Sequence, residues 1–331
     1  MSALKAERFS RYSIALYLLM LVVFFALVTG GRFIEQRNLV NILLQSAINT
    51  ILAVGMTLVI ITGGIDLSVG SVLALCGLVG TDLMMNGLVL GGRTLVPQPE
   101  LAMGIPVAVL VSCVLGALIG WWNGWLIARW NIAPFIVTLA TMTIARGTAF
   151  VYSDGKPVGN LPEAFNRLGG GTGGEVLSIP IPVWIAIFVS LCALIVLRGT
   201  QFGRAVYAVG GNEQAARLSG VDVARVKIIV YVLSGFLAGL CGIVQAARLG
   251  AGDPKYGEMY ELNAIAAVVL GGASLAGGRG GVGGTVVGAM LIGALDNGLV
   301  MAGVSAFYQK VVKGVVILLA VLGDVWQRRR R

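Results

Sequence analysis

The sequence predicts an all-α protein that crosses a membrane about ten times, with some helices short or broken. Hydrophobic residues make up 57% of its 331 residues and charged residues 12%, against roughly 45 to 50% and 25% in ordinary soluble domains. The mean hydropathy is +0.90, and a single soluble core cannot hide that much apolar surface. Glycine occurs 48 times, about twice its usual share, which suits closely packed membrane helices.

The charged and reactive residues exclude several classes of function. The formal net charge is +9, but the basic residues are scattered between apolar stretches, which is typical of a topology signal and not of a nucleic-acid surface. The 4 cysteines are isolated from one another, so they predict neither a zinc site nor a disulfide framework. Histidine is absent, which removes the commonest nucleophile systems and proton shuttle. We therefore expect no catalytic residue, no metal and no nucleic-acid partner.

Ten apolar stretches approach the roughly 20 residues that are needed to cross hydrocarbon. The first follows three basic residues, as in a signal peptide, but it is long and lacks a convincing small-residue cleavage site, so we count it as a helix. The expected spans are residues 12–29, 39–61, 67–90, 104–122, 132–150, 180–197, 227–247, 261–276, 282–300 and 305–323.

The distribution of lysine and arginine predicts which way the spans run. With the N-terminus inside, the inner segments hold 14 of these residues and the outer segments 7, while the other 3 fall within or at the edge of spans. This excess predicts that both termini are inside. Residues 1–331 then form a single transmembrane domain with two longer connections, 151–179 on the periplasmic side and 198–226 on the cytoplasmic side.

The cytoplasmic connection contains a predicted short helix at about residues 211–220. Asn212 is a typical N-cap, Glu213 suits the first turn, and Gly220 is placed to end the helix after about two turns. Such a helix can rest its apolar face on the membrane. Its two adjacent alanines are small for a lipid anchor, and they favour the close approach of another protein.

The same segment carries a resemblance to a known family. Gln214-Ala215-Ala216, with Gly220 six residues after Gln214, resembles the cytoplasmic coupling motif of ATP-binding-cassette importer permeases, in which the first residue is glutamate. The string Gly-Gly-Asn-Glu-Gln-Ala-Ala-Arg-Leu-Ser-Gly and the segment from Gly55 to Ser71 are similar to the ribose and arabinose branch of sugar permeases. The similarity extends through Phe135-Ile-Val-Thr-Leu-Ala-Thr and Val269-Leu-Gly-Gly-Ala-Ser-Leu-Ala-Gly-Gly, over nearly the whole chain.

This resemblance implies a homodimer of permeases that imports a monosaccharide across the bacterial inner membrane. A periplasmic sugar-binding protein would deliver the substrate, and a cytosolic ATPase would supply the energy, so that ATP and Mg bind to that partner and this chain holds no cofactor. The motifs do not identify the sugar. The residues implied in docking to the ATPase are Asn212, Glu213, Gln214, Ala215, Ala216 and Gly220.

A near match to a phosphate-binding loop runs from Gly278 to Thr285. Gly284 stands where the lysine that reaches the phosphates would be. We therefore expect a flexible inner turn at the start of the ninth span and no bound ATP.

Polar residues inside the spans are candidates for a translocation path, because such groups are costly in lipid and usually face protein or water. Under the predicted orientation most of them collect toward the outer side, where amides could exchange hydrogen bonds with a polyhydroxylated ligand. In the alternative interpretation they are hydrogen-bond glue between helices, with Arg146 neutralised by Asp82 or Asp296. The proposed path residues are Asn41, Gln45, Asn49, Asp66, Asn263, Asp296 and Asn297.

Asp66 lies between the second and third spans, where it can cap the next helix. The turn Gly63-Gly64-Ile65-Asp66-Leu67 is similar to Gly271-Gly272-Ala273-Ser274-Leu275 with an offset of 208 residues. Two such turns at the inner mouth could be elements of a gate. Elsewhere, glycines spaced four apart predict close helix contacts. They are Gly116, Gly120 and Gly124, Gly235 and Gly239, and Gly280, Gly284 and Gly288.

Two other classes of function are compatible with the composition. A secondary transporter coupled to ions usually needs charged groups at the midplane, and mid-span charge is sparse here. A membrane-embedded enzyme or scaffold would need a catalytic constellation that the sequence does not offer. An ATP-driven importer permease is therefore the favoured interpretation.

Overall fold

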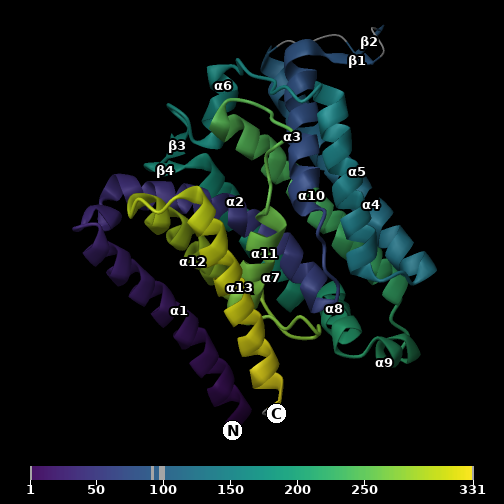
Figure 1. Cartoon of the computed structure of the whole chain (residues 1–331). Coiled ribbons are helices and arrows are strands. Elements are labelled where there is room, and N and C mark those ends of the chain that lie inside the picture. The colour runs from purple at the N-terminus through teal and green to yellow at the C-terminus, as the bar shows by residue number, and fades with distance from the viewer. Residues whose placement is uncertain (1, 91–92, 97–100, 330–331) are drawn as a thin grey trace. The chain divides into compact units, whose positions relative to one another are not determined.

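The structure is a computed structural model that describes residues 2–90, 93–96 and 101–329, and the side chains of residues 14–87 and 104–322. Within these residues the chain is almost entirely helical (Figure 1). Its α-helices are α1 (Ser2–Val28), α2 (Gln36–Ile61), α3 (Val69–Asn86), α4 (Leu101–Trp130), α5 (Pro134–Ser153), α6 (Glu163–Asn166), α7 (Ile181–Gly199), α8 (Gln201–Gly211), α9 (Glu213–Leu218), α10 (Val223–Leu249), α11 (Tyr260–Leu270), α12 (Val282–Met301) and α13 (Ala306–Arg329).

The remaining regular elements are short. Two 3-10 helices, η1 (Arg32–Ile34) and η2 (Arg167–Gly169), follow α1 and α6. Two antiparallel pairs of strands complete the part of the chain that the structure describes. They are β1 (Leu88–Leu90) with β2 (Arg93–Val96), and β3 (Glu175–Val176) with β4 (Ile179–Pro180).

Each of the ten expected spans overlaps a helix, and among the described residues 7 helices are long and apolar enough to cross a membrane. They comprise α2, α3, the Gly104–Trp130 part of α4, α5, α7, α10 and α12. The expected span 261–276 is too long, because α11 ends at Leu270 where Gly271 and Gly272 begin a turn. The chain is therefore a helical, polytopic membrane protein.

The chain divides into two compact units, which are described separately. Unit 1 consists of Met1–Gly64, Ala186–Val221 and Leu262–Arg331. Unit 2 consists of Ile65–Ile185 and Asp222–Glu261.

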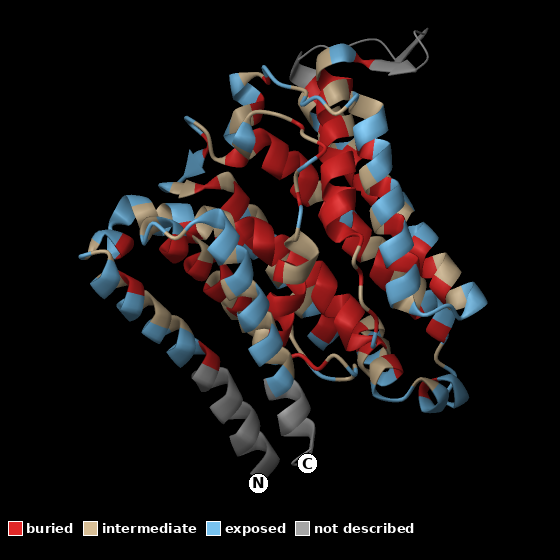
Figure 2. Cartoon of the chain, viewed as in Figure 1, coloured by how far each residue is buried: buried red, intermediate tan, exposed pale blue. Residues whose placement is uncertain are grey.

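Unit 1 is built around α2, which is buried along most of its length (Figure 2). The facing helix α12 packs against α2 and also against α1. Phe25 and Phe33 join Leu295 and Leu299 in one apolar cluster at this contact. Deeper between the helices, the Oγ1 atoms of Thr57 and Thr285 share a buried hydrogen bond of 2.7 Å.

Unit 2 is held together by α10, which packs along both α4 and α3. The glycines spaced four apart lie at these contacts: Gly116 and Gly235 face each other, and Gly239 lies on the backbone of Ser112. A Cβ atom at any of these glycines would overlap the opposite backbone. The sequence predicted that such glycines mark close packing, and the structure shows that α4 and α10 are the partners.

The connection 151–179, expected to be a loop rich in glycine and proline, contains α6, η2 and β3. Phe165 of α6 is fully buried. Val158 forms an isolated antiparallel bridge with Gly252. These contacts fix the connection onto unit 2.

Candidate functional site

The short helix α9 lies where the coupling motif was identified. Asn212 has an extended backbone, with φ −159° and ψ 104°, and its Oδ1 accepts a hydrogen bond from the Ala215 amide at 3.0 Å. This bond satisfies one of the free amides at the start of a helix. Glu213 pairs with Arg217 one turn later at 3.3 Å. Gly220 follows the end of the helix with φ +85°, a conformation that glycine adopts easily.

The residues of α9 differ in what they offer to a partner. Gln214, Ala215 and Leu218 are exposed, and Leu218 has 90% of its surface accessible. Ala216, in contrast, is buried with 5% accessible. Neighbouring helical residues point about 100° apart, so the two alanines cannot both face a partner in this arrangement. The exposed surface of α9 is therefore apolar and small at Ala215, and apolar and large at Leu218.

A second helix, α8, precedes α9 and was not predicted. Thr200 caps it by accepting a hydrogen bond from the Gly203 amide at 3.1 Å. That threonine was the available signal, but Gly203, Gly210 and Gly211 disfavour a helix by propensity and concealed it. Only Asn212 separates α8 from α9, so the two helices are joined almost directly.

The C-terminal half of α8 contacts two other segments of unit 1. The Tyr207 hydroxyl donates a hydrogen bond to the Gly280 carbonyl at 2.9 Å. The Gly278 amide donates to the Ile61 carbonyl, at the end of α2, at 2.8 Å. Gly210 lies directly on that amide and that carbonyl, with no space for a Cβ atom. We call this group, Ile61, Tyr207, Gly210, Gly278 and Gly280, the glycine junction.

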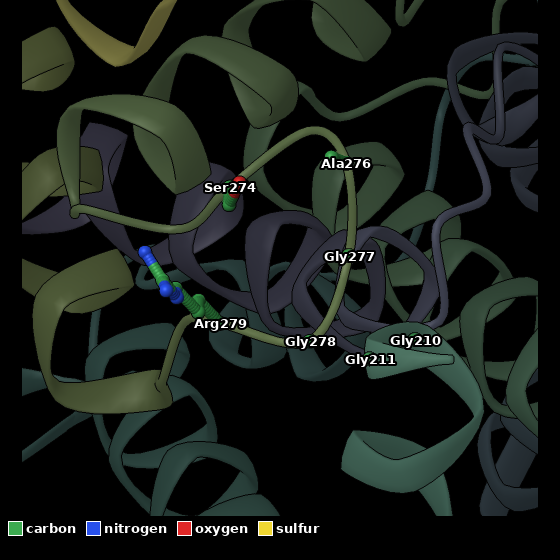
Figure 3. Close-up of a pocket in the computed structure, with 7 residues that line it drawn as sticks. All are labelled: Gly210, Gly211, Ser274, Ala276, Gly277, Gly278 and Arg279. Carbon is green, nitrogen blue, oxygen red and sulfur yellow. The ribbon is translucent and has the colours of Figure 1, made fainter. Parts of the chain in front are cut away.

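A cavity of about 390 Å³ adjoins the glycine junction. Its wall is formed by the end of α8 at residues 210–211 and by the connection between α11 and α12 at residues 274 and 276–279 (Figure 3). The Arg279 side chain points away from the end of α8 in this view. Most of the lining residues are glycine or alanine, so the wall is largely backbone.

The two turns that looked alike in sequence have the same hydrogen-bond pattern. After α2, Gly63 has φ +79°, and the Gly64 amide donates to the Val59 carbonyl. After α11, Gly272 has φ +87°, and the Ala273 amide donates to the Val268 carbonyl. Both are Schellman-type helix ends. Gly63 matches Gly272 and Gly64 matches Ala273, so the structural offset is 209 residues (272 − 63) and not the expected 208.

Asp66 lies in unit 2 and is enclosed, with 1% of its surface accessible. Its Oδ1 accepts hydrogen bonds from the Ser68 amide at 3.0 Å and hydroxyl at 2.6 Å. Its Oδ2 accepts from the Ser234 hydroxyl at 2.8 Å. Burial in this turn raises the pKa of the Asp66 carboxyl, and the hydrogen bonds from Ser68 and Ser234 oppose that rise.

Asn123 and Thr141 extend this set of hydrogen bonds. Asn123 donates to the Ser68 hydroxyl at 3.0 Å, and Thr141 donates to Asn123 at 2.6 Å. We call Asp66, Ser68, Asn123, Thr141 and Ser234 the Asp66 cluster. It connects the turn before α3 to α4, α5 and α10. Asp66 therefore does not line an open surface in this arrangement.

The other candidate path residues lie in unit 1, on three helices. Along α2, Asn41 is exposed, Gln45 is partly buried and Asn49 is buried. Asn263 of α11 and Asn297 of α12 are buried. The set therefore runs from an exposed end of α2 into the interior.

The charged residues of the helices are paired differently from the expectation. Arg146 was expected to meet Asp82 or Asp296, but it donates to the carbonyls of Pro254 at 2.5 Å and Tyr256 at 2.7 Å. Asp82 accepts from the Tyr152 hydroxyl at 2.5 Å. Asp296 forms an ion pair with Lys313 at 2.9 Å. The guanidinium reaches carbonyls because a loop close to α5 presents two of them, a contact that residue type alone does not reveal.

Metal binding has no support in the described part of the chain. There, no group of three or more cysteine, aspartate or glutamate side chains comes close enough to hold a metal ion. Three of the cysteines are buried and Cys192 is exposed, and none of the four forms a disulfide.

Apolar helices long enough to cross a membrane, with an exposed, capped short helix between α8 and α10, fit a membrane transport subunit. Residues 38–321 match the family model described as branched-chain amino acid transport system / permease component. The chain belongs to this family of permeases. It is a transporter subunit and not an enzyme, and it is a multi-pass protein of the inner membrane.

Several characterised proteins are similar to this chain over nearly its whole length. The Ribose import permease protein RbsC of Escherichia coli (strain K12) is 47% identical over 310 residues, covering 93% of this chain and 92% of the relative. RbsC of Bacillus subtilis (strain 168) is 45% identical, covering 92% and 90%. The Xylose transport system permease protein XylH of Escherichia coli (strain K12) is 34% identical, covering 99% and 95%. No solved structure matches the chain.

Proposed function

We propose that this chain is the membrane-spanning permease subunit of an ATP-driven importer for a monosaccharide, a ribose-like pentose or a related sugar. The observation that carries this proposal is the 47% identity to a ribose import permease over 93% of the chain. The relative that transports xylose is less similar, at 34%. Ribose and xylose are both pentoses. The comparison therefore supports a pentose as the substrate more strongly than it supports any one pentose.

The energy for transport comes, in this proposal, from a separate cytosolic ATPase that docks on α9. The exposed side chains Gln214, Ala215 and Leu218 support this role, because they lie on a capped helix within the coupling motif and are accessible to a partner, with Leu218 90% exposed. Asn212, Glu213 and Gly220 fix the ends of the helix and so hold that surface in place. Ala216, which is buried, packs α9 against its own chain and so also helps to hold that surface in place. An ion-coupled transport mechanism is less favoured, because the charge of Asp296 is neutralised by Lys313 and is not available to bind a coupling ion.

A periplasmic sugar-binding protein and a second copy of the permease complete the proposed assembly. Ten spans with both termini in the cytoplasm would place the connection 198–226 inside and 151–179 outside. The excess of 14 inner over 7 outer basic residues supports this orientation. In Figure 1 the start of α1 and the end of α13 lie toward the same end of unit 1 as α8 and α9, which agrees with it.

Cysteine labelling tests the orientation. In a background without the native cysteines, Leu218→Cys and Thr172→Cys place single thiols at exposed positions of the two connections. A membrane-impermeant maleimide added to intact spheroplasts should label Thr172→Cys only, and after lysis it should label both. Labelling of Leu218→Cys in intact spheroplasts would refute the orientation and the docking role.

Reconstituted uptake tests the function itself. The permease is placed in liposomes with a cytosolic ATPase and a periplasmic binding protein of a ribose-type importer, and uptake of labelled pentoses and hexoses is measured with ATP inside. We expect uptake that needs ATP and the binding protein and is selective for a pentose. Uptake driven by an ion gradient without ATP would show a secondary transporter instead.

The polar residues of unit 1, Asn41, Gln45, Asn49, Asn263, Asp296 and Asn297, remain the proposed translocation path. The change from exposed Asn41 through Gln45 to buried Asn49 along α2 supports a path that opens at one end in this arrangement. The double variant Gln45→Leu with Asn49→Leu should reduce uptake without preventing membrane insertion. Normal uptake by that variant would refute the proposed path.

A further inference from the structure

The glycine junction is placed to carry movement from α9 to the helices that bear the candidate path. The first link is the chain itself, since α8 ends at Gly211 and α9 begins at Glu213. The two helices also contact each other, and Ala216 is buried on the inner side of α9. A force on α9 therefore reaches α8 across one residue.

The second link fastens α8 to the end of α2. Ile61 supplies one of the last carbonyls of α2, which have no partner within their own helix. The Gly278 amide satisfies that carbonyl at 2.8 Å, and Gly210 packs on the pair so closely that only a residue without a Cβ fits. The end of α2, the end of α8 and the connection before α12 thus meet at one point.

The third link fastens α8 to the start of α12. The Tyr207 hydroxyl holds the Gly280 carbonyl at 2.9 Å, and α12 begins at Val282. Farther along, α12 and α2 are tied to each other by the Thr57–Thr285 hydrogen bond of 2.7 Å. These two helices carry Asn41, Gln45, Asn49, Asp296 and Asn297, most of the candidate path.

The construction of the junction suits a contact that changes during a transport cycle. Gly277, Gly278 and Gly280 have φ of +86°, +71° and +143°, so the connection follows a course that other residues rarely adopt. It borders a cavity of about 390 Å³ instead of interlocking side chains (Figure 3). Single hydrogen bonds of modest net strength can break and re-form as the backbone moves.

We propose that Tyr207 and Gly210 are positioning residues that couple ATP hydrolysis on the docked partner to the movement of α2 and α12. This inference rests on the proposed function. It goes beyond that function because it assigns the transmission of force to contacts outside the docking helix.

A matched pair of alanine variants tests the proposal. Gly210→Ala introduces a methyl group against the Ile61 carbonyl, whereas the adjacent Gly211→Ala introduces one into open space. Both changes lie in the last turn of α8, so their effects on helix propensity are equal. Each variant is reconstituted with the ATPase and the binding protein, and three quantities are measured: affinity for the ATPase, ATP hydrolysis, and sugar taken up per ATP hydrolysed.

We expect Gly210→Ala to bind the ATPase as the wild type does and to take up about tenfold less sugar per ATP, because overpacking against the backbone disfavours the native contact. Gly211→Ala should match the wild type in all three quantities. A wild-type ratio of uptake to hydrolysis in Gly210→Ala, or an equal loss in both variants, would overturn the proposal.

Tyr207→Phe provides a second measurement in case Gly210→Ala inserts poorly. It removes only the hydroxyl that holds Gly280 and leaves α9 untouched. One hydrogen bond should change the uptake per ATP by about fivefold with unchanged affinity for the ATPase, and an unchanged ratio would overturn the proposal. If the wild-type chain neither binds the ATPase nor takes up sugar, the proposed function fails. Failure of the coupling proposal is instead seen in the variants, measured relative to an active wild type.

Discussion

The Asp66 cluster, around the turn before α3, and the glycine junction, at the ends of α2 and α8, are made in opposite ways. The Asp66 cluster uses side chains from three helices and a turn, and each of its members holds another. The glycine junction uses backbone groups and one tyrosine hydroxyl beside a cavity. Satisfied networks of buried side chains specify one arrangement, whereas glycine backbone admits several. The difference indicates that stability depends on the first and transport on the second.

The largest effect on stability is expected for Asp66→Leu. The change removes the acceptor of three buried hydrogen bonds and leaves the Ser68 and Ser234 hydroxyls without it, so it should lower the free energy of unfolding by about 4 kcal/mol. Asp66→Asn keeps an acceptor for Ser68 and can donate to Ser234, so its loss should be about 1 kcal/mol. Equilibrium unfolding in mixed detergent and SDS measures both, and equal losses would show that the hydrogen bonds do not matter.

The next test asks whether unit 2 is rigid because of this cluster or because of its helix contacts. Gly116→Val forces a branched side chain against the backbone of Gly235, which should cost about 3 kcal/mol. Gly147→Val in α5 is the control, because a Cβ there meets nothing within 4 Å. The same SDS titration applies. A loss at Gly147→Val as large as that at Gly116→Val would mean that helix propensity, and not close packing, sets the effect.

A smaller effect is expected between the helices that the glycine junction is proposed to move. Thr57→Val keeps the shape of the side chain and removes its hydrogen bond with Thr285, so it should cost about 1.5 kcal/mol. The double variant with Thr285→Val measures their coupling, which we expect to be about 1 kcal/mol. Additive losses would show that the two hydroxyls act independently and that this contact does not tie α2 to α12.

The smallest effect on stability is expected on the exposed face of α9. Leu218→Asp should change the free energy of unfolding by less than about 0.5 kcal/mol, because the side chain touches little of its own chain. It should nevertheless weaken binding of the ATPase by about tenfold, which corresponds to about 1.4 kcal/mol. Gln201→Asp adds the same charge at an exposed position in the first turn of α8 and should leave the affinity unchanged. Equal affinities for the two variants would contradict docking through Leu218.

How much of the fold and of the candidate site could be predicted depends on how far apart in sequence the contacting residues are. The Asn212 cap and the Gly220 end of α9 involve neighbours in sequence, so the residue types alone indicated them. The burial of Ala216 depends on which face of a six-residue helix packs inward, which the sequence does not specify. Of the hydrogen bonds that Asp66 accepts, the two from Ser68 are local, whereas the one from Ser234 comes from far along the chain and was not foreseen.

The helices and the partners of Arg146 show the same difference between local and long-range contacts. Apolar length located a helix at each of the ten expected spans, and 7 of the helices in the described residues are long and apolar enough to cross hydrocarbon. Helix α8 was missed, because its three glycines concealed a helix that the Thr200 cap and its tertiary contacts stabilise. Arg146 was matched with the wrong partners, since its acceptors are backbone carbonyls of a distant loop, which side-chain types do not indicate.

The bond from Gly278 to Ile61 also bears on how the chain is made. Unit 2 ends at Glu261, so all of it is synthesised before the last segment of unit 1, Leu262–Arg331. Until Gly278 is synthesised, the Ile61 carbonyl cannot form its hydrogen bond with the Gly278 amide. During biogenesis, therefore, unit 2 can mature before the contact between Ile61 and Gly278 forms.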